Sequence, residues 1–511
     1  MAQQTRKFMN ELHRKSAVEL LKLIESKEVS SREVTQYFID RIEEVNPKIN
    51  AVVLKFYDEA LKKADETDKS EKRGRLHGLP FTIKECFDYV GSPSTLGVLA
   101  RKNDSPKKND AYIQAFLDEG GIVLGKTNVP QLLVFIESDN RVYGKTNNPI
   151  NENFTCGGSS GGEGAIIGAG ASPVGIGSDI GGSLRFPAAF CGICSIKPTM
   201  QRIPDLTRYP NERLQGSINP VAGILANYAE DLDLFLQIMN DAASKFQTVK
   251  PLQDYKNIEV SKLKIGYFHS DGFFEPMAAV KRGVTESIEK LKSAGAEVIE
   301  FEPPKFQFAE EIFYRLMSAD GGNLYREILQ GEKPVPQLKN LMMLTKTSPR
   351  QLKLIKQAAK IFGQKSVVRL LDYFGGKGSD FLRTWANKQA EYQKEFLTAM
   401  EAENIDAIIS PTSALPAFLH GSTDKIGLGG NYTILYNVLG FPAGIARVSE
   451  VKKSEAVGRK AGLDLRDRTA AKTEKMSEGL PLSVQIAAKP WREDVVLALI
   501  EKLHKKAEIS S

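Results

Sequence analysis

The chain has 511 residues, of which 41% are hydrophobic and 26% charged, and its formal net charge is +6. This composition excludes a largely disordered protein, and the charge is too small to indicate a nucleic-acid-binding protein. The chain contains no run of 18 apolar residues, and residues 1–10 lack the apolar stretch of a secretory signal. The sequence therefore predicts neither a transmembrane segment nor a signal peptide. Four cysteines make no disulfide scaffold and favour a reducing compartment such as the cytoplasm.

The first 120 residues combine helical patterns with short apolar runs. Ser16 is a candidate N-cap for a helix over 17–26, and Ser30 and Ser31 are candidates to open a second helix over 32–45. From Leu79 onward, apolar runs bounded by Gly and Pro predict strands. One further strand is predicted earlier, over 50–54. The predicted strands therefore lie at 50–54, 79–84, 121–127, 171–179, 264–267, 297–301, 407–410 and 482–487. A helix over 110–119 lies between two of them, and such alternation predicts an α/β fold. Residues 452–478 are charged and aperiodic, so we expect an exposed excursion between two strands.

The segment 156–199 is unusually rich in glycine, with twelve glycines in 44 residues. Glycine at this density is unfavourable for a sheet core, but it permits tight turns whose N–H groups converge on an anion. Ser159, Ser160 and Ser183 lie inside these glycine turns and are candidate nucleophiles. Apolar residues at buried-looking positions argue against a flexible linker.

A serine nucleophile needs a base, and two kinds of base remain open from the residues alone. The five histidines lie in polar or terminal contexts, and no G-x-S-x-G elbow is present, so a Ser-His-Asp triad has no support. Lys84 ends the apolar run LPFTIK, where desolvation would lower its pKa. Lowering a lysine pKa from about 10.4 to about 7 costs about 4.6 kcal/mol, so this role requires burial.

Other motifs point to weaker alternatives. Residues 120–127, GGIVLGKT, match a phosphate-binding loop, but their interior is a strand-forming run, so we interpret them as a strand. Cys191 and Cys194 form a lone C-x-x-C pair, which is more typical of small buried side chains than of a zinc or redox site. Ser138-Asp139-Asn140 and Ser422-x-x-Lys425 occur in the wrong order for a penicillin-recognising enzyme. No metal site is predicted.

A basic segment stands out at residues 339–371. Its eight basic residues, with no acidic one, are Lys339, Lys346, Arg350, Lys353, Lys356, Lys360, Lys365 and Arg369. Ser348-Pro349 is a plausible helix start, and Leu352, Ile355 and Phe362 follow at helical spacing. A basic amphipathic helical pair suits an anionic membrane surface, and a solvated face packed on the core is an equal alternative. We refer to residues 339–374 as the cap.

Several motifs together resemble the amidase signature family, and most of all its fatty acid amide hydrolases. They are KECFDYVGSPSTLG (84–97), KTNVPQ (126–131), GGSSGGEGA (157–165), FPAAFCGIC (186–194) and ILYNVLGFPAG (434–444). The resemblance spans residues 16–505 and implies one large α/β domain that includes the cap, with a central mixed twisted sheet wrapped by helices. Residues 1–15 and 506–511 would be an N-terminal arm and a C-terminal tail. This replaces the roughly three domains that length alone suggests.

The resemblance also implies roles for individual residues. Ser183 matches the nucleophile, Ser159 the bridging serine and Lys84 the base. The matched oxyanion-hole and substrate-binding residues are Ile180, Gly181, Gly182, Ser183, Ser159 and Leu133, and the matched supporting residues are Asp179, Arg185 and Ser160. Two positions depart from the family pattern: Ser178 replaces a usual threonine, and Ser195 replaces a usual glycine near an expected tight turn. No metal or organic cofactor is implied.

The function implied is hydrolysis of fatty acid amides or related N-acyl amines to a carboxylic acid and an amine or ammonia, through an acyl-enzyme. The expected partners are a small lipid amide substrate, an anionic membrane surface and, as a candidate, a second copy in a homodimer. The expected location is the cytoplasm or a membrane surface. The alternatives are a general small-amide amidase, a tRNA-dependent amidotransferase subunit, and a catalytically silent lipid-binding protein of the same fold.

Overall fold

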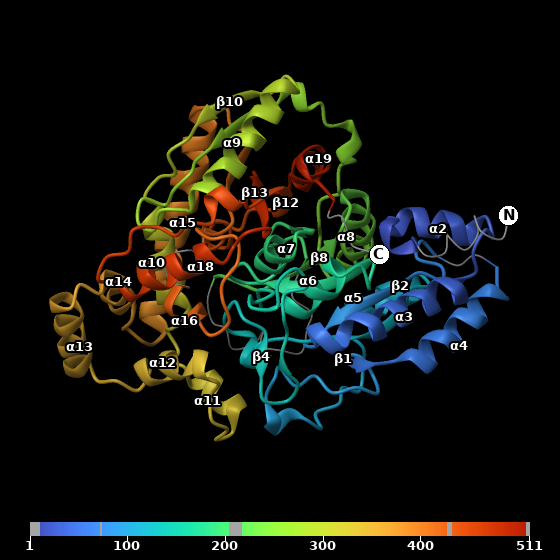
Figure 1. Cartoon of the computed structure of the whole chain (residues 1–511), viewed down its shortest axis with the longest axis horizontal. Helices are drawn as coiled ribbons and strands as arrows, with labels where there is room; N and C mark the ends of the chain where they lie inside the picture. The colour runs from blue at the N-terminus through green and yellow to red at the C-terminus, as the bar shows by residue number, and fades with distance from the viewer. Residues whose placement is uncertain (1–10, 72–73, 204–216, 427–431, 507–511) are drawn as a thin grey trace.

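The centre of the fold is a mixed sheet of eleven strands. The computed structural model describes residues 11–71, 74–203, 217–426 and 432–506 (Figure 1). In spatial order the strands are β1 (Val52–Lys55), β3 (Ile122–Thr127), β2 (Pro80–Lys84), β6 (Val174–Asp179), β8 (Val221–Ala226), β7 (Cys194–Lys197), β12 (Ala443–Glu450), β13 (Pro481–Ala488), β11 (Ala407–Pro411), β9 (Lys264–Tyr267) and β10 (Glu297–Glu300). β2 runs parallel to β3 and β6, and β9 runs parallel to β10 and β11, whereas the other pairs are antiparallel. A separate ribbon joins β4 (Asp139–Asn140) and β5 (Gly144–Lys145).

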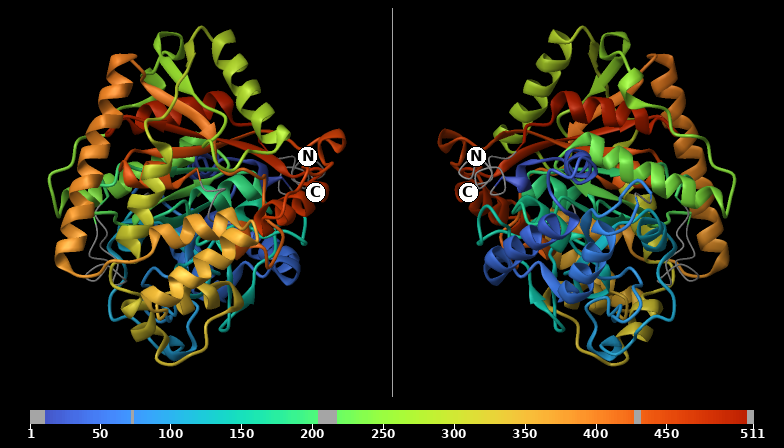
Figure 2. Two further views of the ribbon diagram at one scale, coloured as in Figure 1. Left: turned by 90° about the vertical axis from the view of Figure 1, so that its left-hand side faces the viewer. Right: turned by 90° about the vertical axis from the view of Figure 1, so that its right-hand side faces the viewer.

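Helices cover both sides of this sheet (Figure 2). The helices of the chain, including α11 to α14 that lie away from the sheet, are α2 (Ala17–Glu25), α3 (Ser31–Ile49), α4 (Tyr57–Asp68), α5 (Ala111–Asp118), α6 (Gly161–Gly168), α7 (Arg185–Cys191), α8 (Ala229–Ser244), α9 (Ala278–Ser293), α10 (Phe306–Met317), α11 (Asn323–Leu329), α12 (Pro336–Leu344), α13 (Pro349–Ile361), α14 (Lys365–Tyr373), α15 (Ser379–Ala402), α16 (Thr423–Ile426), α17 (Ile434–Val438), α18 (Leu465–Lys475) and α19 (Glu493–Leu503). The predicted α/β fold, a single large domain with a central mixed sheet, is confirmed.

The local signals at the predicted helix starts act as expected. Ser16 and Ser30 each accept a hydrogen bond from the backbone N–H three residues later, and the glutamate at that position bonds back. Ser348 and Gln351 form the same reciprocal cap at the start of α13, where Pro349 occupies the first helical position. All eight predicted strands are present, with ends shifted by no more than a few residues.

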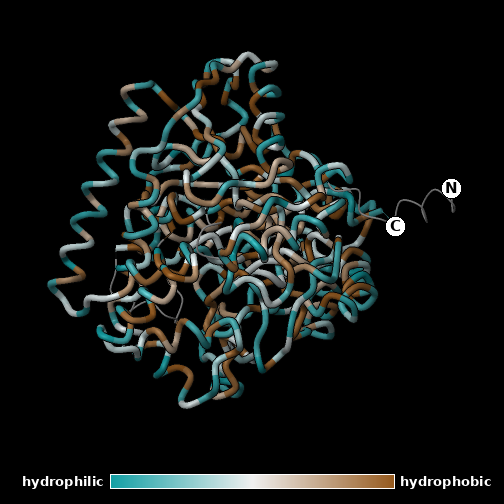
Figure 3. The backbone as a smooth tube through the Cα atoms, turned by 60° about the vertical axis from the view of Figure 1, so that its left-hand side comes forward, coloured by the Kyte–Doolittle hydropathy of each residue, from teal (hydrophilic) through white to brown (hydrophobic). Residues whose placement is uncertain are grey.

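Amphipathic packing explains how the outer helices attach. In α15, the long helix at the left of Figure 3, hydrophilic and hydrophobic turns alternate along the tube. Its buried residues follow a helical period: Trp385, Gln389, Tyr392, Phe396 and Met400. The helix therefore lies with one face on α10 and the other toward solvent.

One expectation is corrected by the structure. Residues 452–478 do connect two strands, β12 and β13, but they contain α18, whose Arg466, Ala470 and Thr473 are buried. The polar composition hid this helix because its contacts are made largely through arginine stems and small side chains. Ser195 lies in β7, directly after the turn at Gly192, and its buried Oγ has no hydrogen-bond partner.

The helices α11 to α14 project from the sheet at the lower left of Figure 1. α13 lies at the outer edge of this group and packs on α14, which in turn contacts α10. None of the helices in the described ranges combines the length and the hydropathy that a membrane crossing requires.

Candidate active site

Lys84 is the last residue of β2 and is completely buried. Its Nζ lies 2.7 Å from Ser159 Oγ and 2.8 Å from Ser178 Oγ. Ser159 precedes α6 and Ser178 lies in β6, so the lysine side chain bridges a strand and a turn on neighbouring elements. The Gly158–Ser159 peptide bond is cis. The structure thus brings together two of the three residues predicted to form the triad and adds Ser178 as a third member of the cluster.

Burial lowers the pKa of Lys84 below its usual range. The nearby Cys86, Asp179 and Glu163 side chains act in the opposite direction, but their effect is smaller. The burial that a lysine base requires is therefore present. A neutral amine has two N–H donors and one lone pair. Ser178 can accept from one N–H while the lone pair accepts the Ser159 proton.

Ser183 opens onto the same cavity as Ser159. It lies between β6 and α7, its carbonyl oxygen accepts a 3.2 Å hydrogen bond from the Ser160 N–H, and its side chain is half-buried. The cavity has a volume of about 270 Å³. No hydrogen bond joins the side chains of Ser159 and Ser183 within the described residues. Catalytic hydrogen bonds are often long before substrate binds and tighten in the complex.

The cavity wall is mainly apolar away from these serines. The loop 132–136 contributes five consecutive residues, among them Leu133, and the helices α10, α11, α12 and α14 contribute most of the rest. The apolar contributors from these helices are Phe313, Tyr314, Met317, Tyr325, Leu341, Leu344 and Leu370. Leu132, Leu133 and Phe135 have positive φ angles between 58° and 80°, a conformation that costs free energy in non-glycine residues and is often found at functional sites.

The loop 180–183 connects β6 to α7 beside Ser159. Ile180, Gly181 and Ser183 line the cavity, whereas the Gly182 N–H donates a 2.8 Å hydrogen bond to Asp179 Oδ1. Gly182 has a φ of 109°, and a Cβ there would collide with Thr433 Oγ1, so only glycine fits. In this structure the Gly182 N–H holds the loop in place and does not face the cavity.

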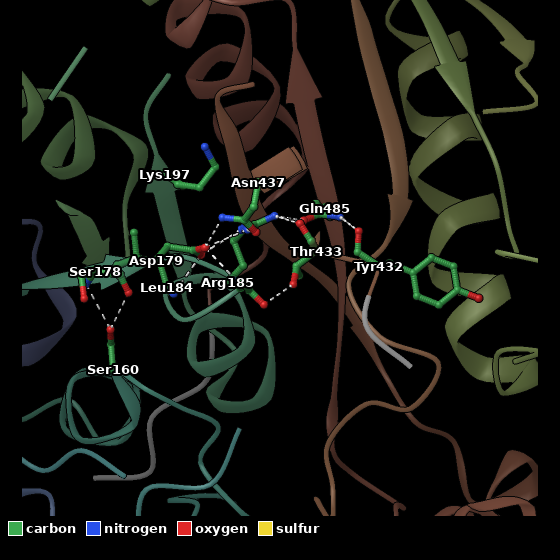
Figure 4. A network of polar contacts seen from close by, with 12 residues as sticks. Ser160, Ser178, Asp179, Leu184, Arg185, Lys197, Tyr432, Thr433, Asn437 and Gln485 are labelled. Carbon is green, nitrogen blue, oxygen red and sulfur yellow. Dashed lines mark hydrogen bonds and ion pairs between the residues drawn. The ribbon is translucent and has the colours of Figure 1, made fainter. Parts of the chain in front are cut away.

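Asp179 and Arg185 anchor this loop through a buried network (Figure 4). Burial would raise the pKa of the Asp179 carboxyl, but the Arg185 charge and several hydrogen bonds hold it well below its usual range. Asp179 also accepts a hydrogen bond from the Leu184 N–H. Arg185 uses all five of its donors, on Asp179 twice and on the Thr433 carbonyl, Gln485 and Asn437 once each. The loop 180–183 is thereby tied to β13 and α17.

Ser160 has a different place from its neighbour Ser159. Its Oγ accepts from the Ser178 N–H and donates to the Ser178 carbonyl oxygen, both at 3.3 Å (Figure 4). It is fully buried and does not line the cavity. Ser160 therefore ties the start of α6 to β6 and supports the site from behind.

Sequence reasoning missed several members of the site. The sequence singled out Ser178 only as a departure from the usual threonine. Its place directly before Asp179, at the end of a glycine-rich strand, is the one local signal that could have marked it as part of the site. Glu163 in α6 is fully buried and accepts hydrogen bonds from Thr82 in β2 and Thr127 in β3; burial raises its pKa to about 8. Asn437 and Gln485 reach Arg185 from far along the chain, which no local pattern predicts. All five histidines lie in described ranges, and none lines the cavity.

Comparison with known proteins agrees with this arrangement. The amidase family matches residues 33–497. Fatty-acid amide hydrolase 1 of Sus scrofa is 31% identical over 501 residues, which cover 95% of this chain and 85% of that protein. Fatty acid amide hydrolase 1 of Caenorhabditis elegans is 30% identical, with coverages of 89% and 82%. The acetamidase of Emericella nidulans is also 30% identical, with coverages of 96% and 88%.

Solved structures give the same result. A fatty acid amide hydrolase superimposes with a TM-score of 0.83 at 26% identity, covering 97% of this chain and 85% of that one. A 6-aminohexanoate cyclic dimer hydrolase, at 20% identity, shares the fold with a TM-score of 0.73 and coverages of 96% and 97%. The chain therefore belongs to the amidase signature family and is an amide hydrolase.

Proposed function

We propose that the protein is a serine hydrolase that cleaves fatty acid amides or related N-acyl amines, with Ser183, Ser159 and Lys84 as its catalytic residues. The observation that carries the proposal is the 2.7 Å contact between a fully buried lysine amine and Ser159 Oγ, at the wall of the apolar cavity that Ser183 also lines. A buried lysine is neutral more readily than an exposed one, so it can act as a base near neutral pH.

In the proposed mechanism, neutral Lys84 accepts the Ser159 proton while Ser159 accepts the proton of Ser183. The Ser183 oxygen attacks the amide carbonyl, and N–H groups of the loop 180–183 that face the cavity stabilise the oxyanion by a few kcal/mol. The proton returns through Ser159 to the departing nitrogen, because an amine anion is a poor leaving group. Water then hydrolyses the acyl-enzyme. Asp179 and Arg185 hold the loop, and Ser178 orients the lysine.

The proposed acyl group is long and apolar. Apolar side chains from loop 132–136 and from α10, α11, α12 and α14 surround a cavity that begins at the serines. Two relatives named fatty acid amide hydrolase and one named acetamidase share about the same identity, so the lining of this cavity, more than the relatives, favours the longer chain. A subunit that acts on glutaminyl groups would need polar partners for a short acyl group, where loop 132–136 and α10 offer apolar ones.

We further propose that the cap docks the enzyme on an anionic membrane surface without crossing it. The outer helix α13 exposes Leu354 (65%) and Ile361 (80%), and Phe362 (69%) follows directly. Arg350, Lys353 and Lys360 are exposed on the same helix. Exposed apolar residues beside basic ones fit an interfacial helix. Two of the eight basic residues contribute less to membrane binding, because Lys356 forms an ion pair with Asp372 and Arg369 forms one with Glu310.

This proposal also covers the organisation of the chain. We propose one catalytic domain over residues 16–505, including the cap at 339–374, with the described part of the arm 1–15 packing at Leu12 and His13. The remaining arm residues and most of the tail 506–511 lie outside the described residues. A homodimer and a cytoplasmic location at a membrane surface stay part of the proposal.

A serine-directed fluorophosphonate tests the chemistry. We expect the probe to label the wild type at Ser183, and we expect Ser183→Ala to abolish both labelling and hydrolysis of a long-chain amide. Lys84→Ala and Ser159→Ala should each impair hydrolysis severely, and the double variant should lose much less than the product of the two losses. Ser195→Gly is the matched control, because its buried Oγ has no partner and lies outside the cavity.

The outcomes separate the alternatives. Near-wild-type turnover by Lys84→Ala at neutral pH would contradict the proton path. A wild type that binds long-chain amides but neither hydrolyses them nor reacts with the probe would be a silent lipid-binding protein. Hydrolysis restricted to small amides, or dependence on glutamine and partner subunits, would indicate one of the other two amidases.

A further inference from the structure

One wall of the cavity is polar and lies away from the catalytic serines. It is formed by Gln337 and Asn340 of α12 and by Thr423 and Asp424 of α16, two helices that pack against each other. Asp424 is the one charged residue among the described residues that line the cavity. This wall therefore differs in chemistry from the apolar walls of loop 132–136 and α10.

Gln337 has an unused hydrogen-bond acceptor at this wall. The residue is only 7% exposed, and its Nε2 donates to Asp139 Oδ2 at 3.3 Å. Because a carboxylate accepts hydrogen bonds and does not donate them, the Gln337 atom that contacts Asp139 is the amide nitrogen. The amide oxygen, Oε1, therefore points away from Asp139. Oε1 is buried and has no partner. A buried acceptor without a partner is costly, and a ligand with a donor would satisfy it.

Asp424 adds a negative charge to this wall. It forms no ion pair in the ranges that the structure describes, its carboxylate accepts backbone hydrogen bonds at the start of α16, and Asn340 Nδ2 donates a long 3.5 Å hydrogen bond to it. The adjacent Lys425 directs its amine to the Gly421 carbonyl oxygen. Burial raises the pKa of Asp424, the adjacent Lys425 charge and the backbone hydrogen bonds oppose this shift only in part, and the Glu137 charge adds to it.

Glu137 and Asp139 lie behind this wall. Glu137 accepts hydrogen bonds from Thr423 Oγ1 and the Gly421 N–H, and Asp139 holds Gln337. The charges that surround the wall are partly balanced by His420, which contacts Glu137, and by Lys145 near Asp139. The residues of this wall that line the cavity nevertheless include one carboxylate, that of Asp424, and the Gln337 amide with its unpaired oxygen, and both favour a cationic donor over an anion.

We propose that this wall binds an ammonium group carried by the amine half of the substrate, so that the preferred substrates are long-chain amides of short diamines. This inference rests on the proposed function, because a long acyl chain held by the apolar walls leaves the polar wall for the amine half. The ammonium takes no part in bond cleavage. It is released with the leaving amine, and the acyl group remains on Ser183.

Three amides with one oleoyl chain test the preference in the wild type. N-oleoyl-1,3-diaminopropane carries the ammonium, N-butyl oleamide replaces it with a methyl group of similar size, and N-oleoyl-β-alanine carries a carboxylate. We expect kcat/KM to fall about tenfold or more from the ammonium to the butyl substrate, and further for the carboxylate. Equal or better hydrolysis of the butyl amide would overturn the inference, and this comparison needs no variant.

Asp424→Asn should reduce the ammonium-to-butyl ratio of kcat/KM about tenfold, and Asp424→Lys should favour the β-alanine amide. Asp380→Asn is the matched control, since it makes the same charge change on α15 at a side chain that is 89% exposed. Thermal unfolding verifies that each variant is folded. An unchanged ratio in Asp424→Asn would overturn the inference.

Binding of the same three amides to Ser183→Ala, measured by calorimetry, separates the two proposals. If Ser183→Ala still hydrolyses amides, the proposed catalytic role fails, yet tighter binding of the ammonium amide would still support the polar wall. If Ser183→Ala is inactive and binds all three amides equally, the proposed function stands and this inference fails.

Discussion

Asn437 and Asp179 lie 258 residues apart in the chain and are joined by a 2.9 Å hydrogen bond from Nδ2 to Oδ1. The Asn437 Oδ1 accepts a 2.6 Å hydrogen bond from Arg185 Nη2, so the amide closes a ring with the ion pair. Asp179 also receives the N–H groups of Gly182 and Leu184. The ring therefore couples a helix near the end of the chain to the loop that precedes the proposed nucleophile.

This ring predicts a positioning role for Asn437. In Asn437→Asp a second carboxylate would face Asp179, and we expect kcat to fall about tenfold or more with a smaller change in KM, because the loop would shift around the reacting carbonyl. Asn437→Leu removes one hydrogen-bond partner from each of two buried charged groups, Asp179 and Arg185. It should lower the free energy of unfolding by about 1.5–3 kcal/mol per lost hydrogen bond. Steady-state kinetics and denaturant unfolding measure the two effects. A loss of stability in Asn437→Asp without any loss of kcat would contradict the positioning role.

Lys84 should make stability depend on pH. Burial lowers its pKa in the folded protein, so between that lowered value and the ordinary 10.5 the unfolded chain binds one more proton than the folded one. The Lys84 contribution to stability therefore increases as pH rises through this window, by up to about 1.4 kcal/mol per pH unit. Lys84→Met has no such group. We expect the free energy of unfolding of Lys84→Met to exceed that of the wild type at neutral pH. This difference in the free energy of unfolding should become smaller toward pH 10.

Urea unfolding of both proteins from pH 7 to pH 10 measures this difference. Lys126→Met is not a neutral comparison, because Lys126 donates to the Pro93 carbonyl oxygen. An exposed control such as Lys353→Met serves better, and its difference from the wild type should stay constant over the same range. A constant difference for Lys84→Met would mean that Lys84 is charged in the folded state.

Acyl length should govern the rate. Each methylene buried against the apolar walls is worth about 0.8 kcal/mol, so kcat/KM should rise about fourfold per added carbon until the cavity is full. Leu341→Trp should fill part of the cavity and move the optimum to shorter chains. A series of primary amides with increasing acyl length measures both optima. A flat or falling series in the wild type would reject the long-chain proposal and point to a small-amide amidase.

Membrane docking should depend on both the basic residues and the exposed apolar residues of the cap. We expect the wild type to sediment with anionic vesicles, and much less with neutral ones or at 1 M salt, where the Debye length falls to about 3 Å. Replacing Arg350, Lys353 and Lys360 with Glu, or Leu354, Ile361 and Phe362 with Ser, should release it, while hydrolysis of a soluble amide continues. Each basic residue near the surface contributes about 1 kcal/mol.

The control for docking is a charge reversal elsewhere. Lys62, Lys63 and Lys69 are exposed on or next to α4, and their replacement with Glu changes the net charge by the same amount. This variant should still sediment. Equal sedimentation of the cap variants and the wild type would show that these side chains only solvate a packed face.

Local signals predicted eight strands and several helices, but they gave no prediction for the strands β7, β8 and β12 or for most of the remaining helices. The strand 264–267 and the caps at Ser16 and Ser348 depend on residues adjacent in sequence, and the structure has them as expected. α18 was missed because its apolar period is weak and its buried face comes from packing on distant segments. At the site, the resemblance identified Lys84, Leu133 and residues of the glycine-rich stretch, but it gave no role to the partners that Arg185 finds in α17 and β13. Their contribution depends on the complete sheet, which no motif encodes.

The position of β13 also bears on how the protein is made. β13 spans Pro481–Ala488, near the end of the chain, yet it lies between β12 and β11 inside the sheet, and its Gln485 holds Arg185. A ribosome delivers this strand after all the other strands of the sheet, so until then the two halves of the sheet have no strand to join them. Arg185 consequently lacks its Gln485 partner, and the loop that it anchors lacks this support, until β13 has been made.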